Sequence, residues 1–215
     1  MIDTIVKVTL FAALMFAAHA SGAPMNTTHT DDTKHSASDK SSAQLKDIAA
    51  QLIAMGEQDQ ADRKLVMSPG FDNHALYTAD LKRQQQLKRL TEGRGLFRLS
   101  EVGQDAVTSE YLIIQHSEPA FMKGFEKEMG ELAAKGDLPK DDYATFVDRI
   151  LIYENKPQRY GTQANGDFEL YPIEDEQSVD KRRASMGLPP LQVLLNKLEK
   201  VKQSVRNGKG LGLGK

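Results

Sequence analysis

Apolar and polar residues alternate along most of the chain with the period of an α-helix. Ser41 and Gln44 match a capping box at the start of a helix. Apolar residues then recur at spacings of three and four, as on the buried face of an amphipathic helix: Leu45, Ile48, Leu52 and Met55. Ser68-Pro69-Gly70 is expected to end this helix.

The same periodicity predicts further helices towards the C-terminal end. Residues that cap or break helices, such as Ser100, Ser117 and Gly136, indicate their boundaries. The expected helices span about residues 73–91, 100–116, 117–136, 139–153, 178–186 and 190–201.

Residues 158–173 change from the helical pattern to short alternating runs. Asn165-Gly166 lies between these runs and is a strong signal for a hairpin, because both central positions of such a turn need positive φ. A two-stranded hairpin is not stable alone and should lie against the helices. The expected fold class is therefore mainly α: a helical bundle of about six or seven helices with a small β-hairpin inserted near the C-terminal end.

The first residues have the pattern of a secretory signal peptide. Lys7 precedes an uncharged apolar run, and Ala18-His19-Ala20 matches an A-x-A cleavage site. The run is shorter than the roughly 20 residues that a membrane-spanning helix needs. An uncleaved anchor or a buried helix is the alternative. We expect an exported protein, periplasmic or secreted, with no stable membrane insertion after cleavage.

The chain divides into four expected segments. Residues 21–41 are rich in Ser, Thr, Asp and Lys and nearly free of large apolar side chains, so they are expected to form a disordered linker. The expected organisation is a signal peptide at 1–20, the linker at 21–41, a single helical domain at 42–206 with the hairpin at about 158–173, and a flexible tail at 207–215.

Composition excludes several classes of function. The 215 residues include no Cys, which excludes a disulfide scaffold, a thiol nucleophile and a Cys-ligated metal. With 28 Lys and Arg against 30 Asp and Glu, the net charge of −2 argues against nucleic-acid binding. Nucleophile-elbow, zinc-protease, phosphate-loop and EF-hand motifs are absent from the sequence. We therefore expect neither a cofactor nor a metal.

His116 is the first candidate site residue. It ends a helix whose preceding residues are apolar, and an imidazole in such a place can act as a general base. The alternative is a histidine that interacts favourably with the helix dipole and one carbonyl group. Gln115 beside it can position a ligand or fasten a loop.

Asp148 and Arg149 form the second candidate. They lie in a helix that is apolar over much of its circumference, where charges are costly unless they are paired. In an enzyme, Asp148 would orient His116. The alternative is structural, with Arg149 bonded to a loop carbonyl or acid and Asp148 capping backbone groups.

The segment QRYGTQ at residues 158–163 is the third candidate. Its polar side chains, those of Gln158, Tyr160, Thr162 and Gln163, suit the wall of a pocket for a polar ligand. Gly161 allows the backbone to approach a neighbouring segment closely. The alternative is a segment whose amides satisfy the ends of helices.

Several ordered segments resemble an uncharacterised bacterial domain-of-unknown-function family. They are YLIIQHS (111–117), DRI (148–150), QRYGTQ (158–163), PI-x-D (172–175) and VDKRRASMGLPPL (179–191). The resemblance covers about residues 45–195 and adds Arg183 to the polar set. The sequence departs from the family pattern at Ser117-Glu118 and in the Gly-rich loop at 93–97. The resemblance implies that the polar residues converge on one site, and it implies no activity or cofactor.

Two classes of function follow from these observations. The first is an exported, non-catalytic module that binds a small polar ligand, a peptide or a protein partner through Gln115, Arg149, Gln158, Tyr160, Thr162, Gln163 and Arg183. The alternative is a hydrolase or transferase in which His116 is the general base, Asp148 orients it and QRYGTQ contributes to the site.

Overall fold

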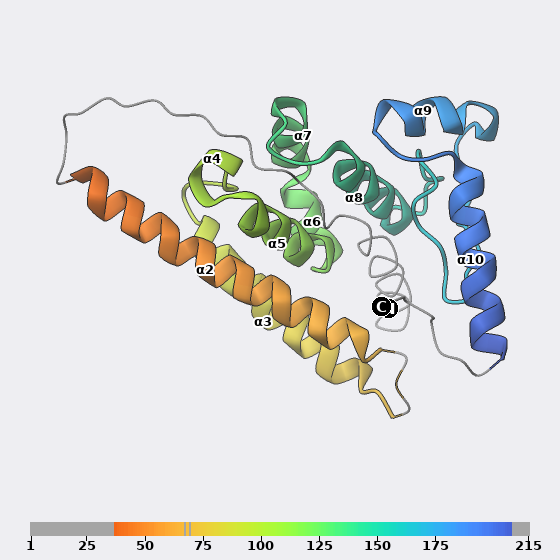
Figure 1. Ribbon diagram of the computed structural model, residues 1–215, viewed down its shortest axis with the longest axis horizontal. Helices are drawn as coiled ribbons and strands as arrows, with labels where there is room; N and C mark the ends of the chain where they lie inside the picture. Colours follow the sequence, from red (N-terminus) through yellow and green to blue (C-terminus); the bar gives the residue numbers. More distant parts are fainter. Residues whose placement is uncertain (1–36, 67, 69, 208–215) are drawn as a thin grey trace.

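The computed structural model of the protein describes residues 37–66, 68 and 70–207. The expected signal peptide at 1–20, most of the expected linker and the tail from residue 208 lie outside the described residues. The described residues contain nine α-helices and one short 3-10 helix (Figure 1): α2 (Ala37–Lys64), α3 (Asn73–Thr91), α4 (Leu99–Val102), α5 (Gln104–Gln115), α6 (Pro119–Gly124), α7 (Glu126–Lys135), α8 (Lys140–Tyr153), η2 (Glu176–Ser178), α9 (Val179–Ser185) and α10 (Leu191–Arg206).

The expectation of a mainly α fold is confirmed, but several helix ends differ from the prediction. The helix expected to begin at Ser100 forms α4 and α5, which are separated at Gly103, where φ is 83°. The next expected helix is divided into α6 and α7 at Phe125. α2 begins at Ala37, so Ser41 lies within the helix and is not its cap. The positive φ at Gly103 lets the chain leave helical geometry between α4 and α5.

The α2–α5 pair is at the centre of the bundle. These two helices make the most extensive contact of any pair, and α3 packs against both (Figure 1). A β-carbon at Gly56 of α2 would lie 2.4 Å from Oγ of Ser109 in α5, so glycine is needed for this close approach. The largest apolar cluster draws on α2, α3 and α5 to α8, with Leu52, Leu87, Ile113, Met122, Met129 and Phe146 among its members.

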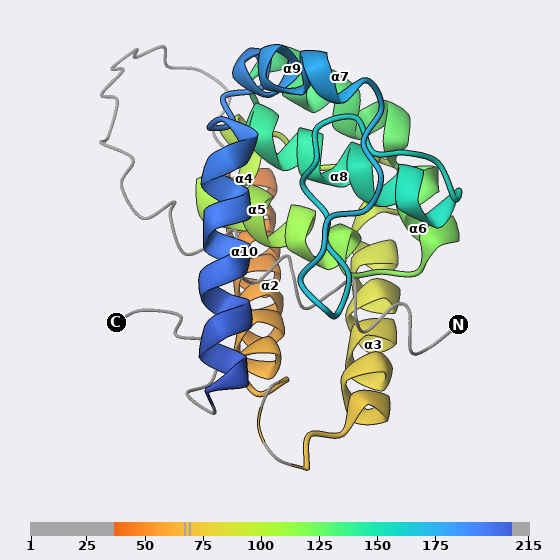
Figure 2. The ribbon, with the colours of Figure 1, turned by 90° about the vertical axis from the view of Figure 1, so that its right-hand side faces the viewer.

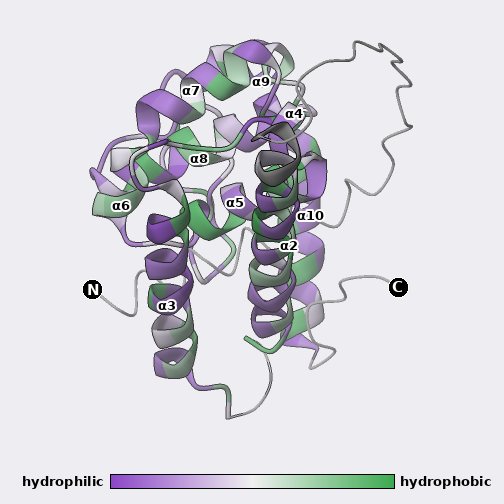
Figure 3. Cartoon of the chain, turned by 90° about the vertical axis from the view of Figure 1, so that its left-hand side faces the viewer, coloured by the Kyte–Doolittle hydropathy of each residue, from purple (hydrophilic) through white to green (hydrophobic). Residues whose placement is uncertain are grey.

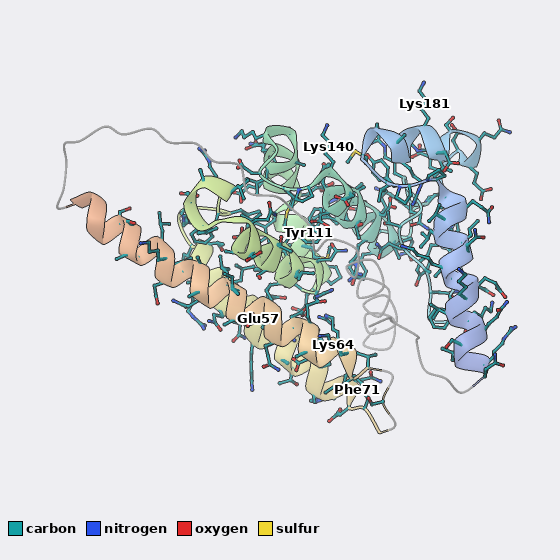
Figure 4. The ribbon with its side chains drawn as sticks, viewed as in Figure 1. Glu57, Lys64, Phe71, Tyr111, Lys140 and Lys181 are labelled. Atoms are coloured by element: carbon teal, nitrogen blue, oxygen red, sulfur yellow. The ribbon has the colours of Figure 1, made fainter. Side chains whose placement is uncertain are left out.

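Amphipathic helices surround this core. Figure 3 shows hydrophilic and hydrophobic residues alternating along α2 and α3, as a half-buried helix requires. Tyr111, labelled in Figure 4, is 1% exposed, whereas Lys181 on α9 points away from the molecule. Within residues 37–66, 68 and 70–207, no helix combines the length and the hydropathy needed to cross a bilayer.

The expected β-hairpin is not shown. Among the described residues there are no named strands, and between α8 and α9 the chain forms loops with two isolated bridges, Gln158 with Ile173 and Ala164 with Leu170 (Figure 2). The positive φ at the turn belongs to Phe168 (61°), and Gly166 does not adopt one. Side chains replace a regular ladder here, because they take up backbone groups that a second strand would otherwise bond.

Asn165 illustrates this replacement. Its side-chain oxygen accepts hydrogen bonds from the N–H groups of Asp167 and Glu169 at 2.9 and 3.0 Å. Its backbone carbonyl accepts from the N–H of Phe168 at 3.0 Å. The Asn-Gly pair therefore does mark a tight turn. The Asn165 side chain stabilises this turn, and the residue with a left-handed backbone conformation is Phe168.

Close contacts fasten this loop segment to the helices. Gly161 has a φ of 67°, and a β-carbon there would lie 2.8 Å from Ile173 and 3.0 Å from Leu191. The close approach expected at Gly161 is therefore confirmed. Ala164 packs with Leu194 and Leu198 of α10 in a second, smaller apolar cluster. The loop segment thus lies between α8 on one side and α9 and α10 on the other.

Candidate functional site

His116 is the C-cap residue of α5, and its side chain is buried against α2. The Nδ1 atom of its imidazole lies 2.8 Å from Oδ2 of Asp59 and 2.8 Å from Nε of Arg63. Asp59 is 0% exposed and His116 is 4% exposed. The carboxylate in contact with the imidazole therefore comes from α2, whereas the sequence analysis assigned this role to Asp148 of α8.

Three carboxylates and two guanidinium groups of α2 and α3 surround this contact. Nη2 of Arg63 lies 2.9 Å from Asp59 and 2.8 Å from Asp80. Arg83 contacts Asp62 at 2.6 Å and Asp80 at 2.7 Å. We call these five residues the α2–α3 ion cluster. Its mutual pairing offsets the cost of burying the charges.

Burial and pairing shift the pKa values of Asp59 and His116. Burial alone would raise the pKa of Asp59, but the attraction of His116 and Arg63 holds it well below its usual range. Burial, together with the positive charge of Arg63, lowers the pKa of His116 from 6.5 to about 4 despite the attraction of Asp59. At pH 7 the carboxylate is therefore charged and the imidazole is neutral. A neutral imidazole has one nitrogen that donates and one that accepts.

Several buried polar atoms at this place have no hydrogen-bond partner within the described residues. They are Nε2 of His116, Nη1 of Arg63 and both amide atoms of the Gln115 side chain. A buried polar atom without a partner costs about 1–3 kcal/mol. Native proteins commonly satisfy such atoms with an ordered water or a ligand.

A small pocket opens beside His116, between α3 and the turn that follows α5. Its volume is about 10 Å³, and it is lined by Tyr77, Asp80, Leu81, Gln84, His116, Ser117 and Glu118. The hydroxyl group of Tyr77 donates to Oε1 of Glu118 at 3.0 Å. The N–H of Glu118 donates to Oε1 of Gln84, also at 3.0 Å. These two bonds hold the turn against α3 and form the rim of the pocket.

Asp148 holds the backbone of the segment after α8. Its carboxylate accepts hydrogen bonds from the N–H groups of Arg159, Tyr160 and Thr162 at 2.7, 3.0 and 2.9 Å. It also accepts from the hydroxyl group of Thr162 at 2.9 Å. Burial raises the pKa of Asp148, and the N–H donors oppose this shift. This is the backbone cap that the structural alternative predicted.

Arg149 is fully buried and joins α8 to the end of α5. Its Nη1 donates to the backbone carbonyl of Gln115 at 2.9 Å, and its Nε donates to Oε1 of Gln163 at 3.3 Å. Burial lowers the pKa of Arg149 below its usual value. The carbonyl contact is again one that the structural alternative predicted.

The amides of residues 158–163 bond to the protein itself. Gln158 donates to the carbonyls of Gln163 and Tyr171 at 3.0 and 2.8 Å. It also accepts from the N–H of Gln163 at 2.8 Å. The side-chain amide of Gln163 donates to Oγ1 of Thr162 at 3.0 Å. These bonds fold the segment on itself beside α8.

Tyr160 and Arg183 fasten α9 to the same segment. Tyr160 is 7% exposed and packs with Ala144 and Leu188. Nη1 of Arg183 donates to the carbonyls of Tyr160 and Gly161 at 2.7 and 3.2 Å. Arg183 is 0% exposed, so its guanidinium group acts as an internal bridge between α9 and the loop.

The structure divides the predicted site residues into two groups. His116 contacts the α2–α3 ion cluster, and Gln115 precedes it. Arg149 links the two groups, because it donates to the carbonyl of Gln115 and to the side chain of Gln163. Within the part of the chain that the structure describes, no hydrogen bond or ion pair joins the His116 side chain to Asp148. The second group gathers around residues 158–163: Asp148, Gln158, Tyr160, Thr162, Gln163 and Arg183.

Asp59 and Arg63 were missed by the sequence analysis, although a signal for them exists. Asp59 follows Leu52 by two helical turns and Arg63 follows by one more, so all three share one face of α2. Charged residues that continue an apolar stripe must be paired when they are buried. Charged residues on the apolar face of α2 therefore predict a buried ion pair in this helix.

Two more buried carboxyl groups lie outside the ion cluster. Burial raises the pKa of Glu110 and that of Asp142 to about 8. Both oxygens of Glu110 accept from the N–H of Phe97, at 3.3 and 3.1 Å. Among the described residues, no group of three or more His, Cys, Asp or Glu is placed to hold a metal ion.

The fold and these contacts define a mainly α-helical domain with a buried ion cluster and a histidine at its centre. The chain matches the model of a family of unknown function (DUF6624) over residues 46–204, and it belongs to that family. Searches of curated proteins and of solved structures give no significant match. The resemblance to a family without an assigned activity is thereby confirmed in its general form, and the ordered motifs remain a prediction.

Proposed function

We propose that the protein is an exported, non-catalytic module that binds a small polar ligand in the pocket at His116. One observation carries this proposal. His116 is buried and lines the pocket, yet its Nε2 atom has no hydrogen-bond partner within the described residues. A ligand with a polar group would supply that partner and offset the cost of about 1–3 kcal/mol for leaving the atom unsatisfied.

The surroundings of His116 support a binding role. Asp59 and Arg63 fix the imidazole from the side opposite its free nitrogen, and the ion cluster holds both in place. A side chain whose orientation is fixed before binding loses little conformational entropy when a ligand arrives. A rigid polar group in a small pocket is therefore suited to selective contact with one group of a ligand.

The contacts of residues 158–163 are internal to the domain, so this segment is less suited to bind a ligand than the pocket at His116. The Gln158 side chain and the Asp148 carboxylate bond to backbone groups of the domain. The Gln163 side chain bonds to Arg149 and Thr162. A ligand that used them would first have to break these bonds. We therefore propose that this segment has a structural role. It joins α8 to α9 and α10 and so stabilises the bundle around the pocket.

Export rests on the sequence pattern of residues 1–20 and is part of the same proposal. The test is the mass of the mature protein recovered from a periplasmic fraction after expression of the full chain. We expect an N-terminus near Ser21. Recovery of the chain with Met1 intact from that fraction would refute cleavage.

Ligand binding is tested with small polar probes and the NMR signals of the histidine side chains. We expect at least one of methylammonium, methanol, acetamide and acetate to shift the His116 ring signals saturably. His74 is exposed and lies in α3, so its signals serve as an internal control. The shift at other pocket residues should disappear in His116→Gln. No saturable shift with any of the four probes contradicts the proposal.

A second function is favoured by the contact between Asp59 and His116. A carboxylate at 2.8 Å from Nδ1 can fix the tautomer that leaves Nε2 free to accept a proton, as a general base requires. In a hydrolase, a water in the pocket would attack the substrate while Nε2 takes its proton. Turnover of p-nitrophenyl esters or phosphates that is lost in His116→Ala would support this function. Equal rates for the two proteins would exclude His116 as the base.

A further inference from the structure

A groove opens between α10 and the turn at residues 168–170, which run side by side in Figure 1. Its volume is about 420 Å³. Small-molecule sites in proteins have volumes of about 300–1,000 Å³, so the groove is large enough for such a ligand. None of its lining residues lines the pocket at His116. The groove is therefore a separate candidate binding site.

Four of the lining residues are apolar. Phe168 and Leu170 belong to the turn, and Leu195 and Leu198 belong to α10. Leu198 is 3% exposed and is a member of the second apolar cluster, whereas Leu195 is 38% exposed. Apolar and aromatic side chains that gather in a concave place, with polar groups beside them, are the usual lining of a ligand site.

Phe168 has an unfavourable backbone conformation. Its φ is 61°, a value that glycine adopts freely and that large residues rarely adopt. The Asn165 side chain accepts hydrogen bonds from the N–H groups of Asp167 and Glu169, the two neighbours of Phe168, and so fixes the turn. The ring packs against the second apolar cluster and lines the groove. Strained residues are concentrated at functional sites, and here the strain keeps an aromatic ring at the groove.

Three polar residues of the groove lie on one face of α10. They are Gln192, Asn196 and Glu199, at spacings of four and three residues. The side-chain amide of Gln192 donates to Oδ1 of Asn196 at 3.0 Å. Each amide has two N–H donors and an oxygen with two lone pairs, so both residues can form further hydrogen bonds. The face therefore offers both donors and acceptors to a ligand.

The charges in the groove do not favour an ionic ligand. Nζ of Lys202 lies 3.2 Å from Oε1 of Glu169, so these two charges compensate each other. Glu199 is exposed and accepts from the side-chain amide of Gln203 at 2.8 Å. A single exposed carboxylate attracts a cation only weakly. It is, however, a good acceptor for a hydroxyl group.

We propose that this groove binds a neutral pyranose sugar, with one face of the ring on Phe168 and the hydroxyl groups bonded to the polar residues of α10. The C–H groups of a pyranose with equatorial hydroxyls form an apolar face. Each hydroxyl donates and accepts, which matches amides and carboxylates. An extended peptide is less suited, because the described residues contain no named strand whose edge it could join. The site goes beyond the function proposed at His116 and does not depend on it.

The test adds cellobiose or sorbitol to the full chain. Cellobiose has equatorial hydroxyl groups on pyranose rings, and sorbitol has similar hydroxyls but no ring. The readouts are the NMR signals of the backbone amides at residues 168–170 and of the Gln192 and Asn196 side-chain amides. We expect cellobiose to shift these signals saturably and to bind at least about tenfold more tightly than sorbitol, which has no rigid apolar face. The His116 ring signals should not move.

Variants of the lining residues test the location of the site. Phe168→Gly removes the ring and relieves the strain, and it should weaken cellobiose about tenfold. Phe168→Leu keeps apolar packing below the groove and should also weaken binding. Gln192→Ala should weaken it about fivefold, as expected for one lost hydrogen bond. The control is Gln85→Ala, because Gln85 is an exposed glutamine of α3 that does not line the groove.

Several results would overturn the sugar site. They are no saturable shift with cellobiose, equal binding of sorbitol, and unchanged affinity in the Phe168 and Gln192 variants alike. Tighter binding of the capped peptide acetyl-Ala-Leu-Ala-amide at the same signals would instead identify a peptide site. An affinity for cellobiose that falls tenfold in high salt would also contradict the proposal, since a neutral ligand forms no ion pair. The function proposed at His116 would stand in each case, because the two sites share no lining residue.

Discussion

Nδ1 of His116 lies 2.8 Å from Oδ2 of Asp59, although the two residues are 57 positions apart in the sequence. Both side chains are buried, and the contact joins the end of α5 to the C-terminal part of α2. The most extensive helix pair of the bundle therefore also carries a buried polar contact. The main helix contact and the candidate site thus use the same two helices, α2 and α5. Substitutions that alter the packing of these helices should therefore also alter the contacts of His116.

Asp59→Asn should strongly destabilise the fold. Loss of the negative charge leaves Arg63 buried without one of its two carboxylate partners and removes the acceptor of the His116 imidazole, and breaking a buried pair in this way costs about 3–5 kcal/mol. Urea unfolding monitored by circular dichroism measures the change. Asp62→Asn is the control, because Asp62 lies in the same helix but its side chain is 25% exposed. Equal losses in the two variants would show that burial of Asp59 does not matter.

Gly56→Ala should also destabilise the protein, although alanine is the better helix former. The added β-carbon would meet Oγ and Cβ of Ser109 at 2.4 and 2.6 Å. Overpacking costs about 1–3 kcal/mol, which exceeds the gain of about 1 kcal/mol in helix propensity. Ser109→Gly in the same chain should restore most of the loss. A Gly56→Ala variant with a raised melting temperature would show that α2 and α5 are less close.

The helices could be predicted because their apolar residues repeat with a helical period. Leu194, Leu198 and Val201 of α10, for example, are all buried as expected. The break at Gly103 was not predicted, because the flanking apolar pattern continues across it. The hairpin signal at Asn165 failed for a different reason. Its side chain bonds to the backbone of the turn, which a pattern of residue types does not reveal.

The candidate site could be predicted only in part. His116 stood out because a polar residue follows an apolar run, and its burial agrees with that pattern. Its partner Asp59 could not be paired with it from one sequence, since nothing local relates residues 57 positions apart. For Asp148, the choice between orienting a histidine and capping a backbone depends on the path of residues 159–162, which is set by tertiary packing.

Glu110→Gln should make stability less dependent on pH. In the folded protein Glu110 keeps its proton up to about pH 8, whereas the unfolded chain releases it near the ordinary value of 4.5. Between these values the folded state binds more protons, so the free energy of unfolding falls as the pH rises. The slope from this group reaches at most about 1.4 kcal/mol per pH unit.

Glutamine does not titrate, but its amide oxygen can still accept from the N–H of Phe97. The difference in unfolding free energy between Glu110→Gln and the original protein should therefore shift in favour of the variant from pH 5 to pH 8. Asp142 titrates in both proteins, so its contribution cancels. Parallel stability curves over this range would show that Glu110 is charged in the folded state.

Asp148→Asn separates the two groups of predicted site residues. The new amide would place a donor against N–H groups that now donate to the carboxylate, so the caps of Tyr160 and Thr162 should weaken. We expect a loss of about 1–3 kcal/mol in unfolding free energy and faster hydrogen exchange at these two amides. Binding of the polar probe that shifts the His116 ring signals should stay within about twofold of the original in the folded variant, because Asp148 is not a lining residue of the pocket at His116. A tenfold weaker affinity in a variant that remains folded would instead restore the single shared site that the sequence first indicated.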